Sequence, residues 1–123
     1  MAQDAPTAVE LLEAVRAYLH EDALPALDGR AAFHARVAAN VVAIVAREIT
    51  LGPEADRSER ARLLLLLSLP ASDARSFSEL NALLAQRIRA GLLDDRRDEL
   101  VAHLRATVRD KLRIANPTHL GTT

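Results

Sequence analysis

The sequence predicts an all-α protein, a single-domain bundle of about five helices with a buried central helix near residues 31–50. Three observations favour this fold class. Aromatic residues are only 2% of the chain, so the core must come from Leu, Val, Ile and Ala, a composition typical of helical proteins. Two capping boxes, Thr7–Glu10 and Ser76–Glu79, mark helix starts. No stretch alternates apolar and polar residues for long enough to predict a strand.

The first two helices are placed by their start and stop signals. The first begins at the Thr7–Glu10 capping box and runs to about Glu21. Pro25 interrupts the chain, and a turn precedes the central helix, which starts near Arg30. We expect the central helix to end at Gly52-Pro53, because proline favours the start of a new helix.

Three further helices follow. The third ends in five consecutive leucines, 63–67, which leave no polar face and must be buried or covered by another chain. The fourth starts at the Ser76–Glu79 capping box, and the last begins at Asp94 or Asp95 and stops at Asn116-Pro117. We expect one helical domain, 1–123, in which residues 1–6 and 118–123 are flexible tails.

Composition excludes several classes of function. The net charge of −1 gives no basic field for nucleic acid or an anionic membrane. The absence of cysteine excludes disulfides, thiolate zinc sites and cysteine nucleophiles. The apolar runs are too short to span a bilayer, and the first residues resemble no signal peptide. We therefore expect a cytoplasmic protein without a nucleic-acid or membrane partner.

The central helix carries polar residues on the side that we expect to face the core. On a helical wheel this side comprises Phe33, Val37, Val41 and Ile44. Asn40 and Glu48 fall on or near it. We interpret Asn40 as a structural amide, because an unpaired buried amide costs about 1–3 kcal/mol. The alternative is a ligand contact in which His34 and Arg36 converge with Asn40 on an anion; otherwise these two are boundary side chains.

Charged residues suggest two further candidates. We expect Glu48 to form a structural ion pair with Lys111 or Arg105, because a general base would need a cleft and a second group. Arg105, Arg109 and Arg113 repeat at intervals of four, where like charges repel. This row indicates either a solvated face that complements the helix dipole, or a site for phosphate, a CoA-type ligand or an acidic partner.

Catalytic and metal sites are not predicted. Glu99 and His103 are four residues apart but have no third or fourth ligand, so we interpret them as a surface pair. No serine lies in a G-x-S-x-G motif, and no glycine-rich loop follows a strand. We expect no catalytic residue, no metal and no cofactor, and an enzyme is disfavoured.

Three segments resemble a known family. They are PTAVELLEAV at 6–15, FHARVAAN at 33–40 with RE at 47–48, and KLRIANP at 111–117. They resemble an uncharacterised family of small helical bacterial proteins, a domain of unknown function, over nearly the whole chain. The resemblance implies genes often encoded beside aminoglycoside-phosphotransferase-like kinases and acyl-CoA dehydrogenases. It implies an accessory role there, and no assigned activity, cofactor or catalytic residue.

Two functions are expected from these observations. The first is a non-catalytic accessory protein that docks on a kinase-like or acyl-CoA dehydrogenase partner through an apolar patch near Leu63–Leu67 or Leu92-Leu93. The alternative is a small bundle, with at most a weak catalytic role, that binds an anionic or CoA-type ligand between the central and last helices. Its pocket would be lined by His34, Arg36, Asn40, Glu48 and Arg109. A homodimer is compatible with either function.

Overall fold

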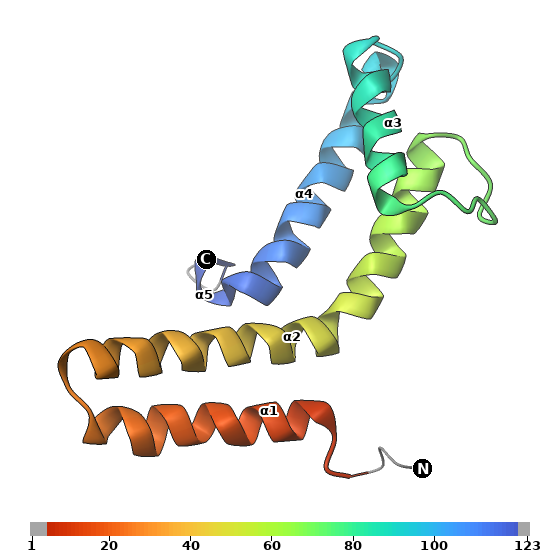
Figure 1. Ribbon diagram of the computed structural model, residues 1–123. Coiled ribbons are helices and arrows are strands. Elements are labelled where there is room, and N and C mark those ends of the chain that lie inside the picture. Colours follow the sequence, from red (N-terminus) through yellow and green to blue (C-terminus); the bar gives the residue numbers. More distant parts are fainter. Residues whose placement is uncertain (1–4, 121–123) are drawn as a thin grey trace. The chain divides into compact units, whose positions relative to one another are not determined.

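The computed structural model describes residues 5–120 and, for side chains, residues 5–118. All regular structure in this range is helical, which confirms the predicted all-α class (Figure 1). The α-helices are α1 (Ala8–Ala17), α2 (Gly29–Leu66), α3 (Phe77–Arg89), α4 (Arg97–Ala115) and α5 (Pro117–Leu120). Two short turns of helix, Tyr18–Ala23 and Leu24–Ala26, follow α1, and another, Asp94–Arg96, precedes α4.

Both predicted capping boxes are confirmed. The Thr7 hydroxyl accepts the Glu10 backbone N–H at 3.1 Å, and the Glu10 carboxylate accepts the Thr7 N–H at 3.4 Å. Ser76 and Glu79 repeat this arrangement at the start of α3, with 3.1 and 3.2 Å. Each box pairs backbone donors that have no partner inside the helix, so it fixes where the helix begins.

The predicted helix boundary at Pro53 is wrong, because α2 continues through this residue to Leu66. Proline removes its own N–H bond and crowds the carbonyl one turn earlier, at a cost of about 3 kcal/mol, but its fixed φ is compatible with a helix. The following residues favour helix strongly enough to continue it. Two predicted helices are therefore one, and among residues 5–120 four helices exceed two turns, so the expected number of about five was slightly too high.

The chain divides into two compact units. The first contains described residues 5–53 and 113–120, and the second contains 54–112, so that α2 contributes to both. The single domain remains a prediction. Of the predicted flexible tails, 1–4 and 121–123 lie outside the described residues, while 118–120 belong to the single turn α5.

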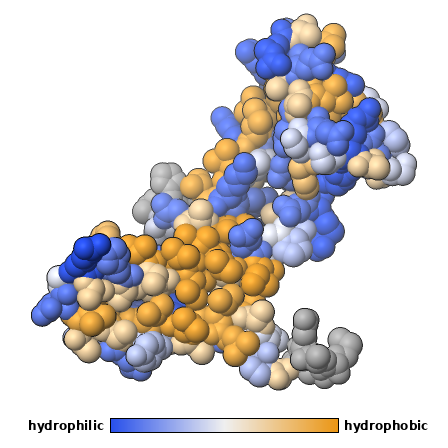
Figure 2. Space-filling view, viewed as in Figure 1, coloured by the Kyte–Doolittle hydropathy of each residue, from blue (hydrophilic) through white to orange (hydrophobic). Residues whose placement is uncertain are grey.

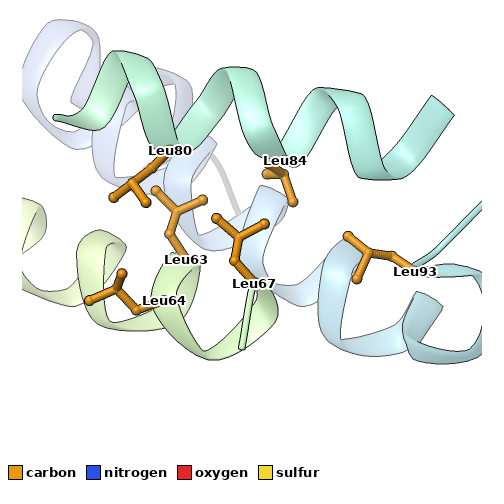
Figure 3. Close-up of a cluster of buried hydrophobic side chains, with 6 residues drawn as sticks. All are labelled: Leu63, Leu64, Leu67, Leu80, Leu84 and Leu93. Carbon is orange, nitrogen blue, oxygen red and sulfur yellow. The ribbon is translucent and has the colours of Figure 1, made fainter. Parts of the chain in front are cut away.

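The core of the second unit consists of leucines. Leu63 of α2 and Leu67, directly after its end, pack with Leu80 of α3, and all three are fully buried (Figure 3). Three more leucines complete this cluster: Leu64, Leu84 and Leu93. The prediction that the leucine run 63–67 is buried is confirmed except for Leu65, which is 72% exposed.

The first unit is a helical hairpin in which α1 lies antiparallel to the first part of α2 (Figure 1). Its buried hydrophobic residues are Ala35 and Ala39. The prediction that the large apolar side chains of the central helix face the core is wrong. Phe33 is 57% and Val41 52% exposed, and apolar surface covers both helices of the hairpin in Figure 2.

The small side chain of alanine explains this difference. Alanine allows two helix backbones to approach closely, so α2 packs through its alanine side and turns its branched side chains outward. A helical wheel locates the largest apolar stripe but does not identify the side that a neighbouring helix covers. Within residues 5–120, no helix is both long and apolar enough to cross a lipid bilayer.

Candidate functional site

The four candidate residues of the central helix are all exposed: His34, Arg36, Asn40 and Glu48. The expectation that Asn40 is buried and that Glu48 lies near the core edge is therefore wrong, because the alanine side of α2 is the inner one. His34 accepts a hydrogen bond at its Nε2 atom from Arg30 Nε at 3.2 Å. His34 and Arg30 thus form a small basic group at the beginning of α2.

The predicted arginine row lies on α4. Arg105 and Arg109 are exposed and belong to the second unit, whereas Arg113 is exposed and belongs to the first. Arg105 and Arg109 are therefore described below, together with the surface of the second unit to which they belong.

One pocket of the first unit lies beside α2 and the last residues of α4. Its volume is about 390 Å³. It is lined by Asn40, Ala43, Ile44, Arg47, Ala115, Asn116, Pro117 and Thr118. Of the four candidates on the central helix, only Asn40 lines this pocket.

Arg47 is the pocket residue that sequence reasoning missed. Its Nε donates a 2.7 Å hydrogen bond to the carbonyl oxygen of Ile114, and so satisfies a carbonyl at the end of α4. A cation there also complements the negative end of the helix dipole. Arg47 lies two helical turns after Asn40, so a helical wheel places the two residues on the same side of α2. The wheel does not predict the carbonyl that Arg47 binds, because that carbonyl is distant in sequence.

The chemistry of this pocket is limited to hydrogen bonding and one positive charge. Asn40 and Asn116 supply amides, and the Thr118 hydroxyl donates to the Asn116 side-chain oxygen at 2.7 Å. No carboxylate or imidazole lines the pocket, so it holds no general acid or base. A small anion or carboxylate matches these groups best.

A second pocket is an open groove between α1 and α2, of about 400 Å³. Two of its three charged residues pair with each other, since Arg16 Nη2 lies 2.6 Å from Glu13 Oε1, and the third, Arg47, bonds the Ile114 carbonyl. The hydrogen bond from Arg16 holds the pKa of Glu13 below its ordinary value. Glu13 therefore stays ionised and is a poor proton donor. No group of three potential metal ligands occurs among the residues with described side chains.

The second unit contains an interior polar cluster. His103 is only 3% exposed, and its Nδ1 accepts a 3.1 Å hydrogen bond from Arg62 Nε. Arg62 Nη2 also donates to the Thr107 hydroxyl at 3.2 Å. Burial, and then the charge of Arg62, lower the pKa of His103. The predicted surface pair of Glu99 with His103 is wrong, because Glu99 instead pairs with Arg96 at 2.7 Å.

Arginines of the second unit also cap the end of α2. Arg87 Nη1 donates to the carbonyl oxygen of Leu67 at 2.5 Å. Arg96 donates to the carbonyls of Leu66 and Leu65 at 3.0 and 3.2 Å. These bonds satisfy carbonyls that have no partner inside the helix. Arg87 and Arg96 are thus structural residues.

The outward side of α4 is the clearest candidate binding surface of the second unit. Val101, Leu104 and Val108 share one side of the helix, and the latter two are 44% and 55% exposed. Exposed Arg105 and Arg109 lie beside them. Apolar side chains along α4 are visible in Figure 2. We call these five residues the α4 face.

The family model of a domain of unknown function, DUF6285, matches residues 25–119. The chain belongs to this family. The DUF6285 match includes α2, α3 and α4, and with them Arg47, the polar cluster of His103 and the α4 face. The helix α1 precedes the first matched residue. Neither a curated protein nor a solved structure matches the chain.

Proposed function

We propose that this protein is a non-catalytic cytoplasmic accessory protein that binds a partner protein through the α4 face. The observation that carries the proposal is the orientation of α4. Its polar residues His103 and Thr107 turn inward and bond Arg62, whereas Val101, Leu104 and Val108 turn outward. A helix that exposes its apolar stripe leaves favourable burial unused, and a partner surface supplies that burial.

The pattern of the α4 face suggests how a partner binds. Val101, Leu104 and Val108 have the i, i+3, i+7 spacing by which a helix inserts apolar anchors into a groove. Arg105 and Arg109 lie along one border, where they are suited to carboxylates on the partner. The partner should therefore have an apolar groove with an acidic rim. The patch expected around Leu63–Leu67 is not used, since four of these leucines are buried.

The family resemblance supports the kind of partner. It implies bacterial proteins encoded beside aminoglycoside-phosphotransferase-like kinases and acyl-CoA dehydrogenases, and we propose one of these two enzymes as the partner. We propose a supporting role for the chain itself. The partner enzyme would supply the chemistry.

The proposal is tested with a purified aminoglycoside-phosphotransferase-like kinase and a purified acyl-CoA dehydrogenase from the organism that encodes this chain. Isothermal titration calorimetry should detect binding of the wild-type chain to one of them. The double variant Leu104→Glu/Val108→Glu should weaken that binding at least about tenfold, because two anchors become charged. Leu65→Glu is the matched control, since Leu65 is exposed in the same unit but lies outside the α4 face. Equal effects of both variants, or binding to neither enzyme, would contradict the proposal.

A second candidate function is binding of a small anion in the pocket near Arg47. The pocket contains Asn40 but none of the other four residues of the predicted ligand pocket, and its volume of about 390 Å³ is near the lower end for ligand sites. It therefore fits a phosphate or carboxylate group better than a whole CoA molecule. In a thermal-shift assay, phosphate or CoA should raise the melting temperature of the wild type and of Arg36→Met, but not of Asn40→Ala. No shift with either compound would exclude this function.

A further inference from the structure

The side of α2 that faces away from α1 is an exposed apolar surface of the first unit. Ala35 and Ala39 are buried on the opposite side, and the groove residues Ala43 and Ala46 show that α1 lies there. The outward side carries Arg30, Phe33, Val37, Val41, Val45 and Glu48, all of them exposed. We call these six residues the outer α2 face.

We propose that two copies of this chain form a homodimer by packing their outer α2 faces against each other in antiparallel orientation. This surface belongs to the first unit and shares no residue with the α4 face of the second unit, so the dimer goes beyond the proposed function. Three properties of the outer α2 face favour this dimer: its apolar centre, its internal symmetry and the signs of its terminal charges.

The apolar centre supplies the reason to associate. Val37 and Val41 occupy the middle of the face, and Phe33 and Val45 lie on either side of them. These side chains are between 40% and 57% exposed. Neither α1, which lies on the alanine side, nor the end of α4, which lies beside Asn40 and Arg47, buries them. Their burial in a dimer would remove apolar surface from water.

The spacing of the six residues is symmetric about position 39. Arg30 and Glu48 are 18 residues apart, which is about five turns, so both point in the same direction from the helix axis. Val37 and Val41 lie two positions on either side of the centre, and Phe33 and Val45 lie six positions on either side. A second copy running in the opposite direction therefore places Val37 against the partner's Val41 and Phe33 against the partner's Val45.

The terminal charges select the antiparallel orientation. Arg30 is basic and Glu48 is acidic, and no hydrogen bond or ion pair joins Glu48 to another described residue of its own unit. In the antiparallel pair, Arg30 lies opposite the partner's Glu48 at both ends. A parallel pair would place Arg30 beside the partner's Arg30, and like charges across an interface are unfavourable. A two-fold axis makes both contacts identical.

The dimensions of the face determine the expected strength. Arg30 and Glu48 are about 27 Å apart along the axis, so a small crossing angle of about 20° keeps both ends within reach of long side chains. One helix face of this length buries less surface than a standard protein interface. We therefore expect a reversible dimer with a dissociation constant in the micromolar range.

Analytical ultracentrifugation of the full chain tests the dimer directly. The wild type should change from monomer to dimer as its concentration rises through the micromolar range. Val41→Glu places two carboxylates near the two-fold axis and should raise the dissociation constant at least about tenfold. Leu65→Glu, an exposed substitution in the second unit, should leave it unchanged. A wild type that stays monomeric at high concentration would overturn the proposal, as would a dimer that Val41→Glu does not weaken.

Charge reversal tests the orientation. Arg30→Glu alone places two acidic residues at each end, and Glu48→Arg alone places two basic residues there, so each variant should dimerise more weakly than the wild type. An equimolar mixture of the two variants should dimerise again, because every terminal contact becomes an acid–base pair. Circular dichroism of each variant checks that the fold is retained. A mixture that associates no better than its components would exclude the antiparallel pairing.

Discussion

His103 is the one buried polar side chain among the residues whose side chains are described. Its Nδ1 accepts a hydrogen bond from Arg62, so the neutral ring must carry its proton on Nε2. Protonation of Nδ1 would replace this bond with two donors facing each other and would add a charge beside Arg62. Burial, which disfavours the charged ring, and then the positive charge of Arg62 lower the pKa of His103, and this shift makes the stability of the protein sensitive to pH.

The stability of the protein should therefore fall as the pH decreases. Above about pH 6.5, His103 is neutral in both the folded and the unfolded state. As the pH falls from 6.5 through the lower folded pKa of His103, the unfolded state binds the proton more strongly and unfolding becomes more favourable. Urea unfolding between pH 8 and pH 5 should show this loss.

Substitution identifies the contribution of His103 to that loss. His103→Gln keeps an acceptor for Arg62 but has no titrating ring, so the free energy of unfolding should depend less on pH over this range. His20→Gln is the control, because His20 is exposed and its variant should retain the wild-type profile. Identical pH profiles for His103→Gln and the wild type would show that another group is responsible.

Among the elements, those with local signals were predicted best. The capping boxes at Thr7 and Ser76 depend on residues three positions apart, and both form as predicted. The predicted end of the central helix depended on Pro53. The helix-forming residues on both sides instead continue the helix through this proline. The inner side of α2 was predicted wrongly because the identity of a neighbouring helix is not a local property.

The difference between local and long-range signals also explains which residues of the candidate site were predicted. Asn40 lines the pocket near the end of α4, but His34, Arg36 and Glu48 do not. The arginines that bind distant carbonyls, such as Arg47 and Arg96, were not identified. Such a bond joins residues as far apart as Arg47 and Ile114, and helical periodicity contains no information about that distance.

Pro53 provides a test of the continuous helix. Proline costs about 3 kcal/mol relative to alanine inside a helix, so Pro53→Ala should raise the free energy of unfolding by about 1–3 kcal/mol. Pro70→Ala is the control, because Pro70 lies in a loop, where the substitution should be neutral or slightly destabilising. Urea unfolding followed by circular dichroism measures both. A destabilised Pro53→Ala would mean that the proline is required where α2 passes from one unit to the other.

At the scale of the whole molecule, the two units differ in how they are stabilised. The second unit buries six leucines in one cluster, and arginines cap the end of its α2 segment. The first unit buries the alanines Ala35 and Ala39 and no residue of α1. Because buried apolar area is the main source of stability, the first unit should open at a lower free energy than the second.

Native-state hydrogen exchange measures this difference. Amides of α1 should exchange fastest among the long helices, and those of α3 and of α2 after Pro53 should exchange slowest. Mass spectrometry of peptides from exchanged protein resolves these segments. Leu80→Ala, which creates a cavity in the leucine cluster, should accelerate exchange in α3 more than in α1. Equal protection of α1 and α3 in the wild type would show that the alanine contact is as stable as the leucine core.

The exposed valines and phenylalanine of the hairpin also have a consequence inside a cell. Chaperones and proteases recognise apolar segments that a folded chain normally hides, and the first unit displays such a segment in its native state. Copies whose outer α2 face is covered should therefore persist, while uncovered copies are removed. For the proposed homodimer, association as well as folding would set the cellular lifetime of this protein, so its abundance should rise steeply once its concentration exceeds the dissociation constant.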